Sequence, residues 1–315
     1  MLSETPFSHV AIIGLGLIGG SMGLALREYL PETRVSGWDA DAHVRAVAAR
    51  RGLAHDVTDT LEEAVAGADL VVLCVPVRAI EAAASALAGK IAPDCVVSDV
   101  GSCKVSVAEA IARALPGQPV VPAHPVAGTE HSGPEAGFPS LFKNRWCIVT
   151  PTKDTDDAAA QRVIALWRAI GATVETMAPD HHDRVLAVTS HVPHLIAYTI
   201  VGTASDLEEV TRSEVIKYSA GGFRDFTRIA ASDPTMWRDV FLSNKDAVLE
   251  ILQRFSEDLT ALQRAIRWGK GDELFEHFAK TREIRRSIIE EGQDDARADF
   301  GRSHDNDRGE EPGGQ

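Results

Sequence analysis

Three glycines between a predicted strand and a predicted helix constrain the fold of this chain more than any other feature. His9–Ile13 has the apolar, β-branched pattern of a buried strand, and Ile18–Tyr29 has the pattern of a helix. A GxGxxG loop joins them. Glycines at this spacing allow a tight turn and let a pyrophosphate approach the free N–H groups that start the helix. We therefore predict a dinucleotide-binding βαβ unit with cofactor contacts from Gly14, Gly16, Leu17, Ile18 and Gly19.

An acidic residue stands where such a unit holds the adenosine ribose. Asp39 ends the next predicted strand, Arg34–Trp38, 20 residues after Gly19. Its carboxylate can accept hydrogen bonds from the ribose hydroxyls and would repel a 2′-phosphate. Ala40 and Asp41, which follow, supply no cation. The strand end therefore predicts NAD rather than NADP as cofactor.

The first half of the chain alternates strand and helix patterns, which predicts a Rossmann-type, doubly wound parallel sheet in an α/β domain. Ligands bind at the carboxyl edge of such sheets, so Val75, Pro76 and the segment Ser98–Ser102 are expected to line the nicotinamide half of the site. The predicted strands are His9–Ile13, Arg34–Trp38, Leu70–Val75, Val96–Asp99, Val120–Pro122, Cys147–Thr150 and a closing strand Ala172–Met177. The predicted helices are Ile18–Tyr29, Ala42–Arg50, Arg78–Ala88 and Lys104–Ala114.

From Asp180 onward the chain is predicted to be wholly helical. Asp180 is the expected N-cap of a helix that Pro193 should kink, and Asp233 caps a second helix with a proline at its first position. Val248–Ile266 carries one apolar stripe that we expect to be buried. With the neighbouring helices it carries more apolar surface than a domain of about 110 residues covers alone, which predicts a homodimer. A last helix spans Asp272–Glu290. The predicted domains are a cofactor domain over 1–178, a helical substrate and dimerisation domain over 179–290, and a disordered acidic tail over 291–315.

The charge balance limits the partners. Asp and Glu total 46 against 32 Lys and Arg, which gives a net charge of −14 and argues against binding to nucleic acid or an anionic membrane. The N-terminal segment lacks the pattern of a signal peptide, and the apolar runs are shorter than a membrane span of about 20 residues. The four cysteines have no zinc-like spacing, so we expect reduced thiols, no metal and a cytoplasmic protein.

Three further segments carry candidate chemistry. His124 leaves a predicted strand end on the cofactor side, where an imidazole suits a general base, although a structural histidine fits the pattern equally well. His191 and His194 share one helix face as ligand-contacting, structural or, less favourably, metal-binding residues. Arg224 and Arg228 lie in a cation-rich stretch that suits a carboxylate, with surface ion pairing as the alternative.

Taken together, these segments resemble the prephenate/arogenate dehydrogenase family of tyrosine biosynthesis. The matching stretches, in order, are GLGLIGGS, SDVGSCK, AHPVAGTEHSG, SHVPH and GGFRDFTRIAASDPTMW. The resemblance implies a Rossmann-type domain, an all-helical domain that forms a homodimer, and an active site between them. We expect neither the regulatory ACT domain nor the fused chorismate mutase that some members of the family carry.

The resemblance also implies roles for individual residues. His124 would be the catalytic base, with Ser102 hydrogen-bonded to it and to the ligand. Arg228 would hold the ring carboxylate, while His194 would face the substrate side chain and His191 support it. The remaining expected substrate-site positions are Thr129, Ser232 and a gating ion pair between Glu130 and Arg224.

The implied reaction is the NAD-dependent oxidative decarboxylation of prephenate to 4-hydroxyphenylpyruvate. Arogenate, or both substrates, is the alternative; prephenate is favoured because His194 can donate to its keto group and Ala230–Ala231 offers no acid for an ammonium. More distant alternatives are a β-hydroxyacid dehydrogenase, for which Lys217 would be the base, and a non-enzymatic NAD-sensing protein.

Overall fold

The structure is a computed structural model that describes residues 5–129, 131–206 and 221–290. The chain divides into two compact units, Met1–Leu252 and Gln253–Gln315. The predicted domain boundary after residue 178 therefore lies inside the first unit and stays a prediction. The predicted disordered tail, Glu130 and Lys217 lie outside the described residues.

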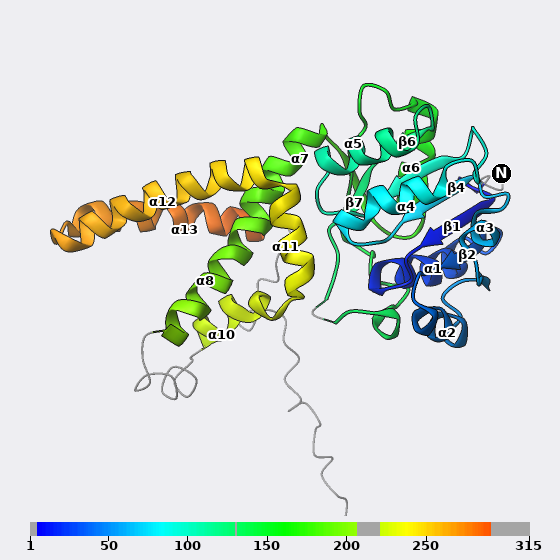
Figure 1. The fold of residues 1–315 in the computed structure, drawn as a ribbon. Helices are drawn as coiled ribbons and strands as arrows, with labels where there is room; N and C mark the ends of the chain where they lie inside the picture. Colours follow the sequence, from blue (N-terminus) through cyan, green and yellow to red (C-terminus); the bar gives the residue numbers. More distant parts are fainter. Residues whose placement is uncertain (1–4, 130, 207–220, 291–315) are drawn as a thin grey trace, which may run out of the picture. The chain divides into compact units, whose positions relative to one another are not determined.

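The N-terminal part of the first unit is the predicted doubly wound α/β domain (Figure 1). Its six-stranded sheet is parallel throughout in the order β3-β2-β1-β4-β5-β6, the arrangement typical of dinucleotide-binding folds. The strands are β1 (His9–Ile13), β2 (Arg34–Trp38), β3 (Asp56–Val57), β4 (Leu70–Leu73), β5 (Val96–Asp99) and β6 (Val120–Val121). The helices are α1 (Leu17–Tyr29), α2 (Ala42–Arg51), α3 (Leu61–Val65), α4 (Ile80–Leu87), α5 (Val105–Ala114) and α6 (Asp157–Ala169), with short 3₁₀ turns η1 (Val77–Ala79) and η2 (Pro134–Ala136).

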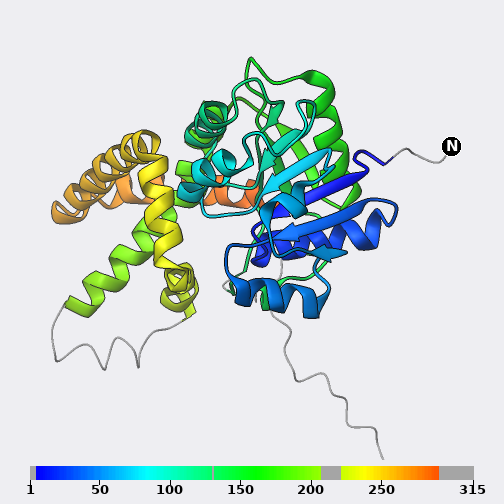
Figure 2. The same ribbon diagram turned by 45° about the vertical axis from the view of Figure 1, so that its right-hand side comes forward.

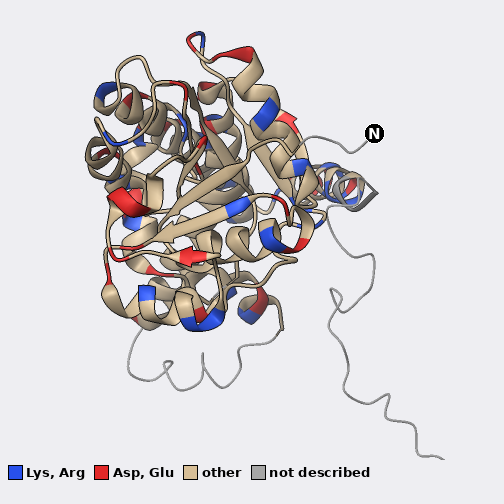
Figure 3. Cartoon of the chain, turned by 90° about the vertical axis from the view of Figure 1, so that its right-hand side faces the viewer, with Lys and Arg blue, Asp and Glu red and all other residues tan. Residues whose placement is uncertain are grey.

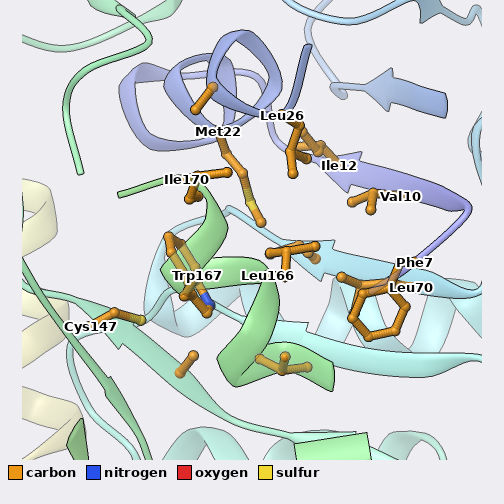
Figure 4. Packing of buried hydrophobic residues seen from close by; sticks show 14 of the residues in the cluster. Phe7, Val10, Ile12, Met22, Leu26, Leu70, Cys147, Leu166, Trp167 and Ile170 are labelled. Atoms are coloured by element: carbon orange, nitrogen blue, oxygen red, sulfur yellow. The ribbon is translucent and has the colours of Figure 1, made fainter. Parts of the chain in front are cut away.

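Alternate residues of each central strand enter two separate cores, as a sheet covered on both faces requires. Val10 and Ile12 of β1 pack with α1 and α6, whereas Ala11 and Ile13 pack with α3, α4 and α5. Figure 4 shows the first core, to which α1 contributes Met22 and Leu26 and α6 contributes Leu166 and Trp167. Figure 2 shows the same sheet turned, with its helices on both faces.

Two predicted strands belong to a different sheet. β8 (Trp146–Val149) and β9 (Thr173–Thr176) join β7 (Ala123–Pro125) in a three-stranded sheet whose first pair is antiparallel. The prediction that they extend the parallel sheet is therefore wrong. Pro122, predicted to continue a strand, separates β6 from β7, since a proline has no N–H to donate to a sheet. The second sheet places His124 opposite Ile148.

The first long helical segment starts earlier than predicted and contains a wider turn. Helix α7 (Pro179–Leu186) is capped by Ala178 rather than Asp180, because Pro179 occupies the first helical position. A π-helical turn, η3 (Ala187–His191), then leads into α8 (Val192–Asp206). The turn lies where a kink at Pro193 was expected, and widening is one way in which a helix accommodates a proline.

The second long helical run is divided at Asn244. Helix α10 (Gly221–Thr227) and the 3₁₀ turn η4 (Arg228–Ala231) precede α11 (Pro234–Ser243), and α12 (Lys245–Arg267) follows it. The Asp233 cap is confirmed, since its carboxylate accepts from the Met236 N–H at 2.8 Å. Asn244 separates α11 from α12 and turns its amide into the protein interior.

The apolar stripe of α12 is buried only at its start. Val248 is 5% exposed, whereas Leu259 is 54% and Ile266 is 67% exposed. Exposed apolar residues continue on α13 (Gly271–Glu290), among them Phe275 and Phe278. Within the single chain the stripe is therefore buried only at Val248, and the exposed remainder agrees with the expectation that it carries more apolar surface than one chain covers.

Among the residues that the structure describes, one helical segment is long and apolar enough to cross a membrane. Pro179–Asp206 has a mean hydropathy of 1.4, and 28% of its apolar window is buried. Its first turns, however, bury the ionisable residues His182 and Asp183 among hydrogen-bond partners.

Charges of both signs are interspersed over the face shown in Figure 3.

A buried ion pair connects the sheet edge to the second sheet. Lys104 and Asp99 have fully buried side chains in direct contact, and the Lys104 ammonium also donates to the Ala123 carbonyl at 2.6 Å. Burial raises the pKa of Asp99, while the ammonium opposes that shift. The pair thus ties the end of β5 to the strand that carries His124.

Replacing Lys104 by methionine should destabilise the protein by about 3–5 kcal/mol, because one buried charge loses its partner. The measurement is the free energy of unfolding in urea. Lys90→Met is the matched control, since Lys90 contacts Glu62 at 2.7 Å on the surface and its loss should change stability little. Equal losses in both variants would contradict the role given to the buried pair.

Candidate active site

Packing within the protein requires glycine at two positions of the glycine loop but not at the third. Gly14 has φ +99°, and a Cβ on it would lie 2.4 Å from the Cys74 carbonyl oxygen; a Cβ on Gly19 would lie 1.9 Å from the Gly14 oxygen. A Cβ on Gly16 would meet nothing within 4 Å. The absence of a side chain at Gly16 therefore leaves space at the N-terminus of α1, where a phosphate group fits. Leu17 and Ile18 form the first turn of that helix.

Asp39 holds the glycine loop from the end of β2. One carboxylate oxygen accepts from the Leu15 N–H at 2.9 Å, and the other accepts from the Asp41 N–H at 2.9 Å. The sequence analysis did not identify Arg45 as a cation close to this site. Arg45 donates to the backbone oxygen of Asp39 at 2.9 Å. Its position six residues later, in the first turns of α2, was the available signal.

The ends of the neighbouring strands β4 and β5 line the same edge of the sheet. Gly14 is seated against Cys74 and Val75, with Pro76 next in the chain before η1. After β5, the Gly101 N–H donates to Asp99 at 2.7 Å, and Cys103 packs with Trp237 and Val240 of α11. The loop that carries Ser102 is thereby fixed between the sheet and the helical part of the same unit.

His124 is buried, and its ring belongs to a chain of hydrogen bonds. Its Nδ1 lies 2.9 Å from Nε2 of His182, and Nδ1 of His182 lies 2.8 Å from Oδ1 of Asp183. Burial lowers the pKa of His124 well below its usual value, and the pKa of His182 is also lowered by burial. Both rings are therefore neutral near pH 7. Within the described residues the ring of His124 has no hydrogen bond to Ser102, whose expected orienting role stays a prediction.

Two more histidines and a tryptophan adjoin this chain. The Asn244 amide donates to the Asp183 backbone oxygen at 2.8 Å and to Nδ1 of His191 at 3.1 Å. His194 stacks on the Trp237 ring with centroids 3.6 Å apart. Nε2 of His191 and Nε1 of Trp237 are buried without a partner in the described part of the chain. They are donors that a bound ligand could satisfy.

The structure connects Arg228 to this cluster. Burial lowers the pKa of His194, and the positive charge of Arg228 lowers it further. Arg228 itself is exposed at the start of η4, and Ser232 closes that turn, with its backbone oxygen accepting from the Tyr198 hydroxyl at 2.8 Å. The roles expected for Arg228, His194, His191 and His124 at one site stay predictions.

Two other predicted site residues, Arg224 and Thr129, contact residues close to them in the sequence. Arg224 has an ion pair with Asp225 at 3.7 Å, while its expected partner Glu130 lies outside the described residues. Thr129 is exposed and closes a local turn with the His131 N–H.

Sequence reasoning missed His182, Asp183 and Asn244 as residues of this cluster. The available signals were the adjacent pair His182-Asp183 in a helix that begins at a proline, and a polar residue in the middle of an apolar helical run. No group of three metal-binding side chains occurs among the residues that the structure describes.

Comparison with known proteins identifies the family. Residues 22–176 match the prephenate dehydrogenase nucleotide-binding domain, and residues 178–280 match the prephenate dehydrogenase dimerization domain. The chain belongs to the prephenate dehydrogenase family. Its resemblance to that family, inferred from five short stretches, is confirmed.

Individual members of the prephenate dehydrogenase family align over most of the chain. A cyclohexadienyl dehydrogenase from Zymomonas mobilis is 45% identical over 90% of this chain and 97% of the relative. A prephenate dehydrogenase from Bacillus subtilis is 33% identical over 88% of this chain and 75% of the relative. The crystal structure of the Aquifex aeolicus prephenate dehydrogenase with hydroxyphenyl propionate and NAD+ has a TM-score of 0.84 at 34% identity, covering 89% of this chain and 98% of that one.

The two kinds of glycine in the loop predict different defects. Gly16→Ala should fold normally but bind NAD about tenfold more weakly or worse, because the new methyl group occupies the space left for phosphate. Gly19→Ala should lower the unfolding temperature, because its Cβ would overlap the Gly14 oxygen. Calorimetry of NAD binding and thermal unfolding separate the two. Unchanged NAD affinity in a folded Gly16→Ala protein would contradict the assignment.

Proposed function

We propose that this protein is a homodimeric, cytoplasmic NAD-dependent dehydrogenase that converts prephenate to 4-hydroxyphenylpyruvate by oxidative decarboxylation. The observation that carries the proposal is the position of His124. A neutral, buried imidazole lies beside the carboxyl edge of a dinucleotide-binding sheet and is linked to the cluster that contains His194 and Arg228.

The residues of the cofactor edge fit NAD. The open space at Gly16 and the N–H groups of α1 suit the pyrophosphate, and the Asp39 carboxylate suits the ribose hydroxyls and disfavours a 2′-phosphate. Arg45 does not reverse this preference, because it donates to the backbone carbonyls of Asp39 and Ala40. When bound, the nicotinamide accepts the hydride from C4 of the substrate.

His124 supplies the base for that step. It takes the proton from the C4 hydroxyl as the C4 hydride leaves, which produces a carbonyl at C4. The ring then loses its C1 carboxylate as carbon dioxide, and aromatisation to a phenol makes the step irreversible. The protein needs to contribute orientation, one base and a carboxylate contact.

Arg228 supplies the carboxylate contact. The protein carries a net charge of −14, so a dianionic substrate needs local cations and donors. Arg228 offers a planar fork that matches a carboxylate, and the unpartnered donors on His191 and Trp237 can bind further oxygens of an anionic or keto side chain.

A second substrate, arogenate, is supported by His194. Its Nδ1 donates to the Ser190 backbone oxygen at 2.8 Å, because a carbonyl can only accept. Nε2 of the neutral ring is therefore an acceptor, which suits the ammonium of arogenate and weakens the argument that His194 donates to the keto group of prephenate. Together with the relative named cyclohexadienyl dehydrogenase, this supports activity on both substrates.

The dimer is supported by the exposed apolar surface of α12 and α13 and by the family's dimerization domain. Side chains such as Leu259, Ile266 and Phe275 are more than half exposed in the single chain. Stable dimer interfaces bury such surfaces.

Loss of the base should abolish turnover with little effect on cofactor binding. His124→Asn is expected to lower kcat for prephenate by roughly 10²–10⁴, the usual contribution of a general base. The measurement is NADH formation with prephenate and, in parallel, with arogenate, together with NAD affinity. A kcat near wild type would refute the assignment of His124, and no turnover of either substrate by the wild type would refute the proposed function.

Loss of the carboxylate contact should weaken substrate binding. Arg228→Ala is expected to raise KM for prephenate by roughly 10- to 150-fold, since a charged hydrogen bond contributes about 1.5–3 kcal/mol in ground and transition states alike. Arg228→Lys should recover only part, because a point charge cannot reproduce the fork. If KM stays within about twofold in both variants, Arg224 becomes the candidate.

The protein should have the mass of a dimer in solution at micromolar concentration, measured by light scattering. Leu259→Glu or Phe275→Glu should shift the mass towards that of the 33.8 kDa chain, because each puts a charge on an apolar surface. A wild-type protein with the mass of a single chain would contradict the dimer.

A further inference from the structure

We propose that His182 and Asp183 are positioning residues that fix the tautomer of His124, so that its Nε2 is the basic nitrogen, and that they stabilise the ring once it is protonated. This inference rests on the proposed function, in which His124 is the base. It adds two residues to the site residues that were predicted from the sequence.

The donor in each hydrogen bond of the series His124–His182–Asp183 follows from the Asp183 carboxylate, which can only accept. The Asp183 carboxylate, 2.8 Å from Nδ1 of His182, requires a proton on that nitrogen. His182 is neutral because burial lowers its pKa, so its Nε2 carries a lone pair. Nδ1 of His124, 2.9 Å away, must then be the donor. The remaining nitrogen of a neutral His124, Nε2, is left unprotonated and able to accept a proton.

Asp183 is held rigidly enough to impose this order. Its Oδ1 also accepts from the Lys104 N–H at 2.7 Å, and its Oδ2 accepts from the Val105 N–H at 3.0 Å. Both N–H groups belong to the start of α5, where a carboxylate is stabilised by the helix dipole. Asn244 binds the Asp183 backbone oxygen, so both the carboxylate and the main chain of this residue are fixed.

The hydrogen-bonded series His124–His182–Asp183 also connects His124 to a negative charge. The ring of His124 is 8% exposed, and its other charged or titratable neighbours, Lys104 and His191, disfavour a positive charge there. The Lys104 charge is paired with Asp99. When Nε2 of His124 takes the substrate proton, Asp183 is the negative group connected to the resulting cation through hydrogen bonds. The serine hydrolases use a carboxylate behind a histidine in the same way.

The proton balance is simple. The C4 hydroxyl gives its proton to Nε2 of His124, and the hydride would go to a bound nicotinamide. Loss of carbon dioxide leaves its electron pair in the ring as a phenolate, which takes the proton back from Nε2 of His124 to become the phenol, so no further oxidant or acid is needed. The Nδ1–H of His124 remains in its hydrogen bond to His182, and the Nδ1–H of His182 remains in its bond to Asp183. The two positioning residues therefore work through His124.

Two substitutions at His182 distinguish positioning from simple packing. His182→Gln keeps the polarity, because its amide N–H can donate to Asp183 while its oxygen accepts from His124. His182→Leu removes the acceptor but leaves Asp183 and its bonds to α5 in place. We expect kcat to fall about 10²-fold or more in His182→Leu with KM within about twofold, and to be largely restored in His182→Gln.

The tautomer of His124 can be measured without substrate. Nitrogen NMR of histidine-labelled protein, with the His124 signals assigned as those missing in His124→Asn, should show Nδ1 protonated and Nε2 unprotonated in the wild type and in His182→Gln. In His182→Leu the two tautomers should mix. This readout separates failure of the inference from failure of the proposed function, because it does not depend on turnover of prephenate.

The carboxylate is tested by Asp183→Asn, which removes the charge. We expect kcat to fall by roughly 10²–10⁴-fold. Asp180→Asn and His181→Leu are matched controls, since these two residues precede the pair directly in the same helix and are exposed. Both controls should keep wild-type kcat.

Three results would overturn the inference. One is a wild-type His124 with its proton on Nε2. Another is a His182→Leu protein with wild-type kcat. The third is an equal loss of kcat in His182→Gln and His182→Leu, which would indicate that the imidazole acts through packing. If Asp183→Asn fails to fold, the His182 pair and the NMR readout still decide.

Discussion

The contact between the Asp183 carboxylate and the start of α5 is the interaction on which the site depends. It joins the first helix after the second sheet to the carboxyl edge of the Rossmann sheet. Because the same carboxylate binds His182, which in turn binds His124, one buried anion positions a helix and orients the proposed base. A buried carboxylate is tolerated here because it accepts hydrogen bonds from the backbone N–H groups of Lys104 and Val105 and from the His182 ring.

The Lys104–Asp99 pair performs a related task next to His124. The Lys104 side chain binds Asp99 and the Ala123 carbonyl, while its backbone N–H binds Asp183. One residue therefore links β5, β7 and α7. Lys104 therefore fixes the backbone next to His124, while His182 fixes its ring.

Much of the N-terminal fold could be predicted because its signals are local. The glycine loop, the Asp39 strand end and the alternation of strands and helices are each read within about 20 residues. The second sheet could not, because the pairing of β7 with β8 and of β8 with β9 is not encoded in the strands themselves. The sequence also did not indicate which residues of the apolar stripe the chain itself covers, Val248 rather than Leu259 and Ile266, since the pattern looks the same whether its own chain or a second copy covers it.

By itself, the sequence determined the doubly wound fold, the family, and His124, His194 and Arg228 as candidates. These conclusions depend on residue types at fixed spacing, which reflect local backbone geometry. Tertiary structure decided which groups meet. It brought His182 and Asp183 to His124 across 58 residues of sequence, placed Asn244 between Asp183 and His191, and left two buried donors for a ligand. Such contacts depend on how helices pack against a sheet edge, and no spacing along the chain records that.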